Sequence, residues 1–190
     1  MAASDQIVVA GEFDIYVGPE GTVLPTDSTT ALDPAFKKVG LTTRDGSAFQ
    51  ISPEFKNVES HQSQYPTRTF RTKVTGTVRA ALQEWNDTNF TTSFGGGTVT
   101  EPDPTTKPGE YRFDPPAGSG TEIVAVVLQM IDGTKHYRFV VDTCQAQSPV
   151  ELPFNPESET VLPLELSVLG DGSVAPWHLL TNDPAFNPAA

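Results

Sequence analysis

Residues 65–97, which read YPTRTFRTKVTGTVRAALQEWNDTNFTTSFGGG, decide the fold that this sequence predicts. Between Phe70 and Leu82, apolar residues alternate with threonine, lysine and arginine. A period of two with many β-branched residues is typical of a strand that buries one face. We therefore expect a long strand here, with its apolar face made of Phe70, Thr72, Val74, Gly76, Val78, Ala80 and Leu82.

Near Ala80 the spacing of apolar residues changes to that of a helix. One α-helix is expected at about residues 81–94, with an apolar face of Leu82, Trp85 and Phe90. Gly95–Gly97 ends this helix, because glycine readily takes the left-handed conformation that follows a helix. A helix this short is not stable by itself in water. It must pack against a sheet, which the rest of the chain has to supply.

The rest of the chain has the pattern of short strands separated by turns. Strands are expected at residues 7–17, 39–43, 49–58, 110–113 and 161–169, and Pro53 suggests a sheet edge or a bulge. Long loops at about 18–36 and 95–109 and an extended tail at about 181–190 complete a single domain spanning 1–190. We expect the first loop to make an intermolecular contact. The predicted fold is mainly β, a sandwich or barrel-like domain of antiparallel strands with one flanking helix.

The clearest hairpin of the chain surrounds Asp132-Gly133, where the sequence favours a type I′ turn. Strands are expected at 122–131 and 134–145, and a two-residue loop would pair Ile131 with Thr134. One face of this hairpin is strongly apolar and is assigned to the core: Val124, Val126, Leu128, Met130, Tyr137, Phe139 and Val141.

The opposite face of the same hairpin is mixed, yet it is too apolar to lie against water. Either the helix or another subunit is expected to cover it. Under the second alternative it forms part of a subunit interface, made of Ile123, Ala125, Val127, Gln129, His136, Arg138 and Val140.

A basic stripe follows the polar face of the long strand, at Arg71, Lys73 and Arg79. The simplest interpretation is a solvated strand face. The sharper hypothesis assigns these residues to the subunit interface, where they would form ion pairs with an acidic neighbour.

The overall composition points to an acidic, soluble protein. Twenty-four acidic and twelve basic residues give a net charge of −12. Such a chain gains nothing from counterion release on a phosphate backbone, which argues against sequence-specific binding of nucleic acid. No apolar run approaches the length of a membrane span, so we do not expect membrane insertion. We expect the protein to be synthesised in a cytosol. The single cysteine, Cys144, excludes an internal disulfide.

No pattern of residues predicts catalysis, a cofactor or a metal site. His61, His136 and His178 lie far apart and lack the spacing of metal ligands. Cys144 has no family signature around it and is interpreted as a buried core residue. Gly95–Gly97 follows the predicted helix and therefore offers no helix N-terminus to a phosphate.

Two further functions are kept as alternatives. A β-sandwich that binds carbohydrate or a cell surface would use Trp177 and loop tips, while Trp85 is assigned to core packing. A small hydrolase would use His178 or His136 with a nearby serine or aspartate, although the sequence offers little for it.

Several segments together resemble the major tail tube protein of long non-contractile-tailed bacteriophages. They are GEFDIYVGPEGT at 11–22, LTTRDGSAF at 41–49, ALQEWNDTNF at 81–90, FGGG at 94–97 and APWHLLTNDPAF at 175–186. The likeness covers most of the chain and keeps its order, and it lies in the ensemble because no single motif is diagnostic.

The resemblance implies a structural virion protein without catalytic residues. It implies a barrel-like sandwich with one helix, joined side by side into hexameric rings that stack into a tube. The implied partners are further copies of the chain, the tape measure protein, and the tail terminator and distal tail proteins. Genomic DNA would pass through the lumen without specific binding. The implied location is the virion tail, after synthesis in the host cytoplasm.

Overall fold

The computed structural model describes residues 7–44, 46–118, 120–147 and 149–188, and these form a mainly β fold as the sequence predicts. Eight strands make one antiparallel sheet. In chain order they are β1 (Glu12–Pro19), β2 (Lys37–Lys38), β3 (Ala48–Val58), β4 (Arg68–Leu82), β7 (Ile123–Asp132), β8 (Lys135–Ala146), β9 (Leu162–Val168) and β10 (Trp177–Thr181). Two short strands, β5 (Thr98–Thr100) and β6 (Arg112–Asp114), pair with each other in a second sheet.

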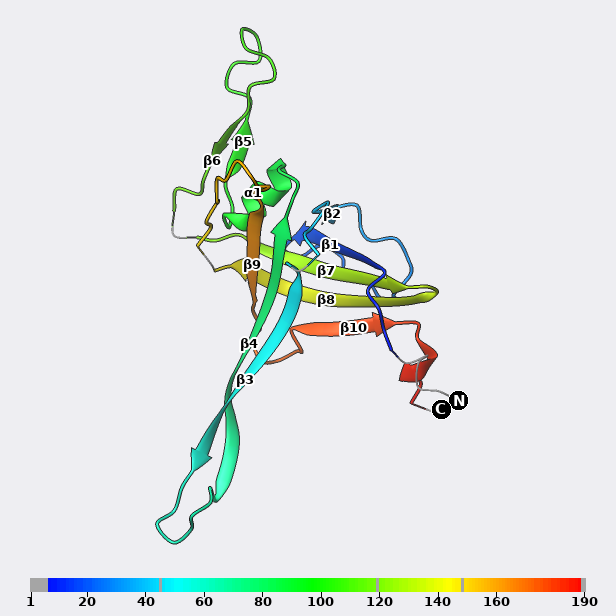
Figure 1. The fold of residues 1–190 in the computed structure, drawn as a ribbon, viewed down its shortest axis with the longest axis vertical. Coiled ribbons are helices and arrows are strands. Elements are labelled where there is room, and N and C mark those ends of the chain that lie inside the picture. Colours follow the sequence, from blue (N-terminus) through cyan, green and yellow to red (C-terminus); the bar gives the residue numbers. More distant parts are fainter. Residues whose placement is uncertain (1–6, 45, 119, 148, 189–190) are drawn as a thin grey trace.

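Strand β8 joins the two halves of the large sheet. The strand order is β2-β1-β7-β8-β9-β4-β3, and β10 also pairs with β8. Residues 137–141 of β8 pair with β10, whereas residues 144–146 pair with β9. In Figure 1, β1, β7, β8 and β10 therefore run across the direction of β9, β4 and β3. This crossing of two half-sheets is the sandwich-like arrangement that the sequence predicts.

The main core lies where the two half-sheets meet. Both contribute inward-facing side chains, because alternate residues of a strand point to the same face. The buried cluster contains Ile15, Val17, Val39, Val78, Ala80, Leu82, Val124, Val126, Leu128, Val141, Cys144, Leu162, Leu164 and Leu166. The predicted core face of the central hairpin is thus largely confirmed, with Met130 half-buried at its turn end.

The helix is shorter than the sequence predicts and begins later. Strand β4 continues to Leu82, which pairs with Leu162 of β9 and is fully buried. Helix α1 spans only Asp87–Ser93, because the Asn86 side chain accepts the backbone N–H of Asn89 at 2.8 Å and caps the helix. The predicted helical face of Leu82 and Trp85 is therefore wrong, and only Phe90 of that set lies on α1.

Other boundaries also differ from the prediction. The first strand begins at Glu12. The strand expected at 39–43 does not form: Thr42 makes one isolated bridge with Leu82, and the two-residue strand β2 lies just before this range. Strand β5 lies inside the loop expected at 95–109. The C-terminal tail contains the short 3-10 helix η2 (Pro184–Phe186). Pro53 lies in β3, an edge strand with a register shift between Glu54 and Phe55, as its position suggests.

The central hairpin forms at the predicted place with a different register. Asp132 pairs with Lys135, so the two-residue loop is Gly133-Thr134. Gly133 has a φ of 61°, and no described residue other than glycine has a positive φ. A type I′ turn needs positive φ at both loop positions, so a glycine-first type II′ turn fits instead. From Asp132 to Val126 the shift moves the pairing by two residues, which leaves the side chains on their predicted faces.

Candidate interaction surfaces

The mixed face of the central hairpin is covered from within the chain. Ala125, Val127 and Val140 form a second buried cluster together with Phe36, and Leu24, Leu32, Tyr16 and Leu180 pack against it. The cover is thus the loop of residues 20–36 with part of β1 and β10, and not helix α1. The loop that was expected to reach another molecule lies on its own sheet.

Arg138 fixes that loop to the hairpin. Its side chain is only 2% exposed. One guanidinium nitrogen donates to the backbone carbonyls of Asp27 at 2.8 Å and Thr30 at 3.0 Å, and another donates to Oε1 of Gln129 at 2.8 Å. Burial lowers the pKa of Arg138, although a guanidinium keeps its charge at neutral pH. A buried cation therefore holds the loop through neutral oxygen atoms.

Asp27 organises the part of the loop that Arg138 grips. Its carboxylate accepts the backbone N–H groups of Thr29 and Thr30 and both threonine hydroxyl groups. These hydrogen bonds hold the pKa of Asp27 well below its usual range, and the one from the Thr30 hydroxyl has the largest effect. The turn thus presents two backbone carbonyls to Arg138.

The other three predicted interface residues of the hairpin, Ile123, Gln129 and His136, are half-buried. A role of the hairpin face in a subunit contact stays a prediction. For Ala125, Val127, Arg138 and Val140 that role requires the loop of residues 20–36 to move, because the loop covers them.

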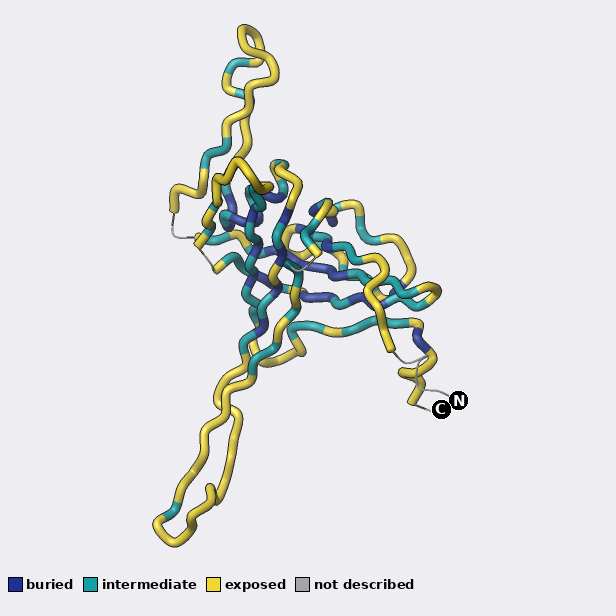
Figure 2. The backbone as a smooth tube through the Cα atoms, in the orientation of Figure 1, coloured by how far each residue is buried: buried dark blue, intermediate teal, exposed yellow. Residues whose placement is uncertain are grey.

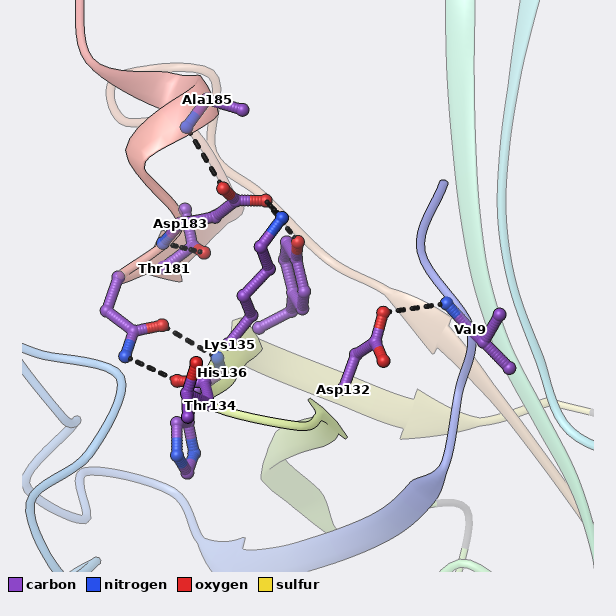
Figure 3. A network of polar contacts seen from close by, with 10 residues as sticks. Val9, Asp132, Thr134, Lys135, His136, Thr181, Asp183 and Ala185 are labelled. Atoms are coloured by element: carbon purple, nitrogen blue, oxygen red, sulfur yellow. Dashed lines mark hydrogen bonds and ion pairs between the residues drawn. The ribbon is translucent and has the colours of Figure 1, made fainter. Parts of the chain in front are cut away.

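The turn of the central hairpin collects segments from both ends of the chain (Figure 3). Asp183 lies buried there and accepts from the Tyr137 hydroxyl and from the backbone N–H of Ala185 at 3.0 Å, with Lys135 Nζ at 3.3 Å. The backbone N–H of Val9 donates to Asp132 at 3.1 Å. The hydrogen bond from Tyr137 is the main cause that lowers the pKa of Asp183. The C-terminal segment is therefore anchored to β8.

Strands β3 and β4 continue beyond the sheet as a two-stranded arm, here defined as residues 52–75 (Figure 1). Strand β9 pairs with β4 only from Gly76 to Leu82, and β3 is the terminal strand of the sheet. Residues 68–75 of β4 therefore pair with β3 alone, and both edges of the arm are open. Figure 2 shows the arm as almost wholly exposed.

The arm carries apolar side chains that its own chain leaves exposed. They are Phe55, Val58, Tyr65, Phe70 and Val74, with Phe55 63% exposed and Val74 45% exposed. Large apolar side chains on strands with open edges are typical of a surface that another chain covers. The apolar residues of β4 thus continue beyond the core of their own chain.

A bulge interrupts the arm and divides its apolar residues between two faces. Lys73 pairs with Glu54, whereas Arg71 pairs with Phe55, so one residue of β4 is left over between them. Phe70 therefore falls on the opposite face from Val74, and the single apolar face predicted from Phe70 to Leu82 is wrong at its outer end. Of the apolar side chains on that face, only Val78, Ala80 and Leu82 are buried.

The basic stripe has two different environments. Arg79 lies beside the sheet and forms an ion pair of 3.0 Å with Glu165 of its own chain. Arg71 and Lys73 lie on the exposed arm, and in the described ranges no carboxylate comes within ion-pair distance of either. Only these two remain available to an acidic neighbour.

The opposite end of the molecule carries an aromatic cluster between α1 and β6. The rings of Phe90, Phe94 and Phe113 lie 5.4–5.8 Å apart, and Trp85 contacts Phe90 at 5.2 Å. Trp85 remains 46% exposed although its Nε1 donates to the Thr160 carbonyl at 3.2 Å. The sequence assigned Trp85 to the core, which is correct only for one side of the ring.

The residues considered for chemistry are dispersed. His61 lies in the arm tip and His178 on β10, both exposed, and the described part of the chain holds no group of three or more potential ligands that could bind a metal. Burial raises the pKa of the Cys144 thiol to about 12. Trp177 packs against Phe49 at 5.3 Å rather than standing free for a sugar. Among described helices, none has the length and apolar character needed to cross a bilayer.

A comparison with protein families agrees with the resemblance seen in the sequence. A family model described as phage tail tube protein matches residues 1–190. The comparison with curated proteins gave no match.

Proposed function

We propose, since the chain belongs to the phage tail tube protein family, that it is the self-assembling subunit of a tail tube. A member of this family is a structural component of the virion tail. Copies of the chain would join into rings, hexameric by the resemblance, and the rings would stack into the tube through which the genome is delivered.

The arm carries this proposal. Its exposed apolar residues and two open edges would favour aggregation in a protein that worked as a monomer. In a homo-oligomer the same features give a neighbouring copy both backbone hydrogen-bonding groups and apolar side chains to bind. Strand pairing between subunits would also turn open edges into a continuous barrel.

The acidic composition supports a passage for DNA. A net charge of −12 gives the chain no counterion-release gain on a phosphate backbone, so DNA would slide through the lumen without specific binding. The further partners proposed are the tape measure protein inside the tube and the tail terminator and distal tail proteins at its ends. Before assembly the subunit would reside in the host cytoplasm.

An assembly assay tests the proposal. Purified chain, examined by negative-stain microscopy and sedimentation, is expected to form rings or tubes as its concentration rises. Phe55→Ser removes an exposed apolar side chain of the arm and should raise the concentration needed for assembly about tenfold. Val174→Ser removes a similarly exposed side chain from the β9–β10 connection and is the matched control.

Two results would contradict the proposal. One is a chain that stays monomeric at high concentration, even alongside tail assembly factors. The other is that neither substitution changes the concentration needed for assembly, which would mean that the arm is not part of the contact.

A further inference from the structure

Helix α1 and the β5–β6 hairpin lie at the end of the molecule opposite the arm (Figure 1). An open aromatic cleft of about 190 Å³ lies between them. Trp85, Phe90, Val99, Tyr111 and Phe113 line it, from the β4–α1 connection, α1 and the β5–β6 hairpin. Phe90 is half-buried against the core, whereas Tyr111 is 72% exposed. The cleft therefore presents ring faces that its own chain leaves uncovered.

The two ends of the molecule differ in charge. Residues 84–114, around the cleft, contain six acidic and two basic residues. Both bases already have acidic partners nearby, Arg112 with Asp114 at 2.6 Å and Lys107 with Glu110 at 3.9 Å. Asp87 lines the cleft itself. This end consequently has a surplus of carboxylates beside its exposed rings.

The arm has the opposite character. Residues 52–75 contain four basic and two acidic residues, in a chain whose net charge is −12. Arg71 is the cross-strand partner of Phe55, so the arm places a guanidinium next to an exposed ring. Guanidinium groups stack on aromatic faces and form ion pairs with carboxylates. The chemistry of the arm thus complements that of the cleft.

We propose that the arm of one copy docks into the aromatic cleft of the next copy, end to end. This inference rests on the proposed self-assembly and adds which surface receives the arm. Because the arm and the cleft are different surfaces at opposite ends, each bound copy leaves one arm and one cleft free. Such a contact continues along the long axis without closing, which is the requirement for stacking.

Two variants that each block one half of the contact test the inference. Arg71→Glu with Lys73→Glu reverses the charge of the arm, and Tyr111→Glu places a charge on the rim of the cleft. Each variant alone should need about a tenfold higher concentration to form long polymers. Their mixture should form a complex of twice the mass of either variant, because the intact arm of the Tyr111→Glu variant binds the intact cleft of the arm variant. This complex should not grow further, since its remaining arm and its remaining cleft are both altered. Circular dichroism confirms that both variants are folded.

Cross-linking gives an independent measurement that does not depend on weakening the contact. Cys144 is fully buried, so cysteines introduced at the surface provide the reactive thiols. A mixture of Val74→Cys and Tyr111→Cys chains should give a cross-linked pair within the assembly. Val74→Cys mixed with Val174→Cys should not, and it serves as the control.

The possible failures are distinguishable. If the wild-type chain never assembles, both this inference and the proposed function fail. If it assembles while Tyr111→Glu polymerises like the wild type, or while Val74→Cys cross-links only to the control position, the docking inference alone is wrong.

Discussion

Strand β4 has two halves with one pattern and opposite surroundings. From Gly76 to Arg79 it pairs on both sides, with β3 and β9, and the pairing with β9 continues to Leu82. From Arg68 to Thr75 it pairs with β3 alone. Val78 in the first half is 0% exposed, whereas Val74, four residues earlier in the second half, is 45% exposed. The comparison teaches that alternation marks a face for burial without saying which chain buries it.

The same substitution in the two halves should give opposite phenotypes, and this is the largest effect we expect. Val78→Asp buries a charge without a partner, so it should lower the free energy of unfolding by about 3–5 kcal/mol or prevent folding. Val74→Asp should change it by less than about 0.5 kcal/mol and block assembly instead. Urea denaturation and sedimentation measure the two effects. Equal destabilisation by both substitutions would remove the distinction between core and arm.

Deleting side-chain volume should give a smaller form of the same contrast. Leu82→Ala leaves a cavity in the core and should cost about 2–5 kcal/mol of unfolding free energy. Phe70→Ala removes a larger side chain from the arm, yet its cost to the isolated subunit should stay below about 1 kcal/mol because the ring is exposed. Thermal unfolding of monomeric samples compares them. A costly Phe70→Ala would show that the arm is part of the folding core.

The mixed face of the central hairpin is a third surface to compare, because the loop of residues 20–36 of the same chain covers it. Arg138→Met keeps the apolar part of the side chain and removes three hydrogen bonds, and it should destabilise the subunit by about 1–3 kcal/mol. Hydrogen exchange should rise in the loop more than in β7 and β8. Uniform exchange across all three would mean that Arg138 does not hold the loop separately.

The smallest effect expected is the pH dependence of the C-terminal anchor. The folded pKa of Asp183 is lowered, so its contribution is present above its unfolded pKa and is lost as pH falls through the folded value. The hydrogen bond to Asp183 raises the pKa of Tyr137 to about 12, so that contribution is lost as pH rises toward that value. Melting temperatures measured against pH should fall less steeply on the acid side in Asp183→Asn and less steeply on the alkaline side in Tyr137→Phe. Unchanged slopes would contradict this account.

The sequence predicted the β class and the two faces of the central hairpin, because both follow from period-two alternation. It misplaced the start of the helix because Leu82 fits both a strand and a helix spacing. Asn86, a favourable N-cap residue, was the signal that could have corrected it.

The interaction surfaces were less predictable, because local patterns do not identify the partner of an apolar face. The hairpin face needed cover, and the sequence offered the helix or another subunit. The structure instead covers it with a largely polar loop, whose Leu24, Leu32 and Phe36 side chains pack against the face. The arm could not be recognised either, since nothing local to β4 tells where β9 stops pairing with it.

The continuity of β4 has a mechanical consequence. Its fifteen residues form one strand from the core to the arm, which corresponds to about 50 Å of extended backbone. At Gly76, where the core half begins, a Cβ atom would lie 2.8 Å from the Val168 side chain, so β9 presses closely on the strand there. A pull on the arm would therefore load the inter-strand hydrogen bonds of the sheet in shear. A filament joined through such arms would owe its bending stiffness to folded sheet, not to flexible tethers.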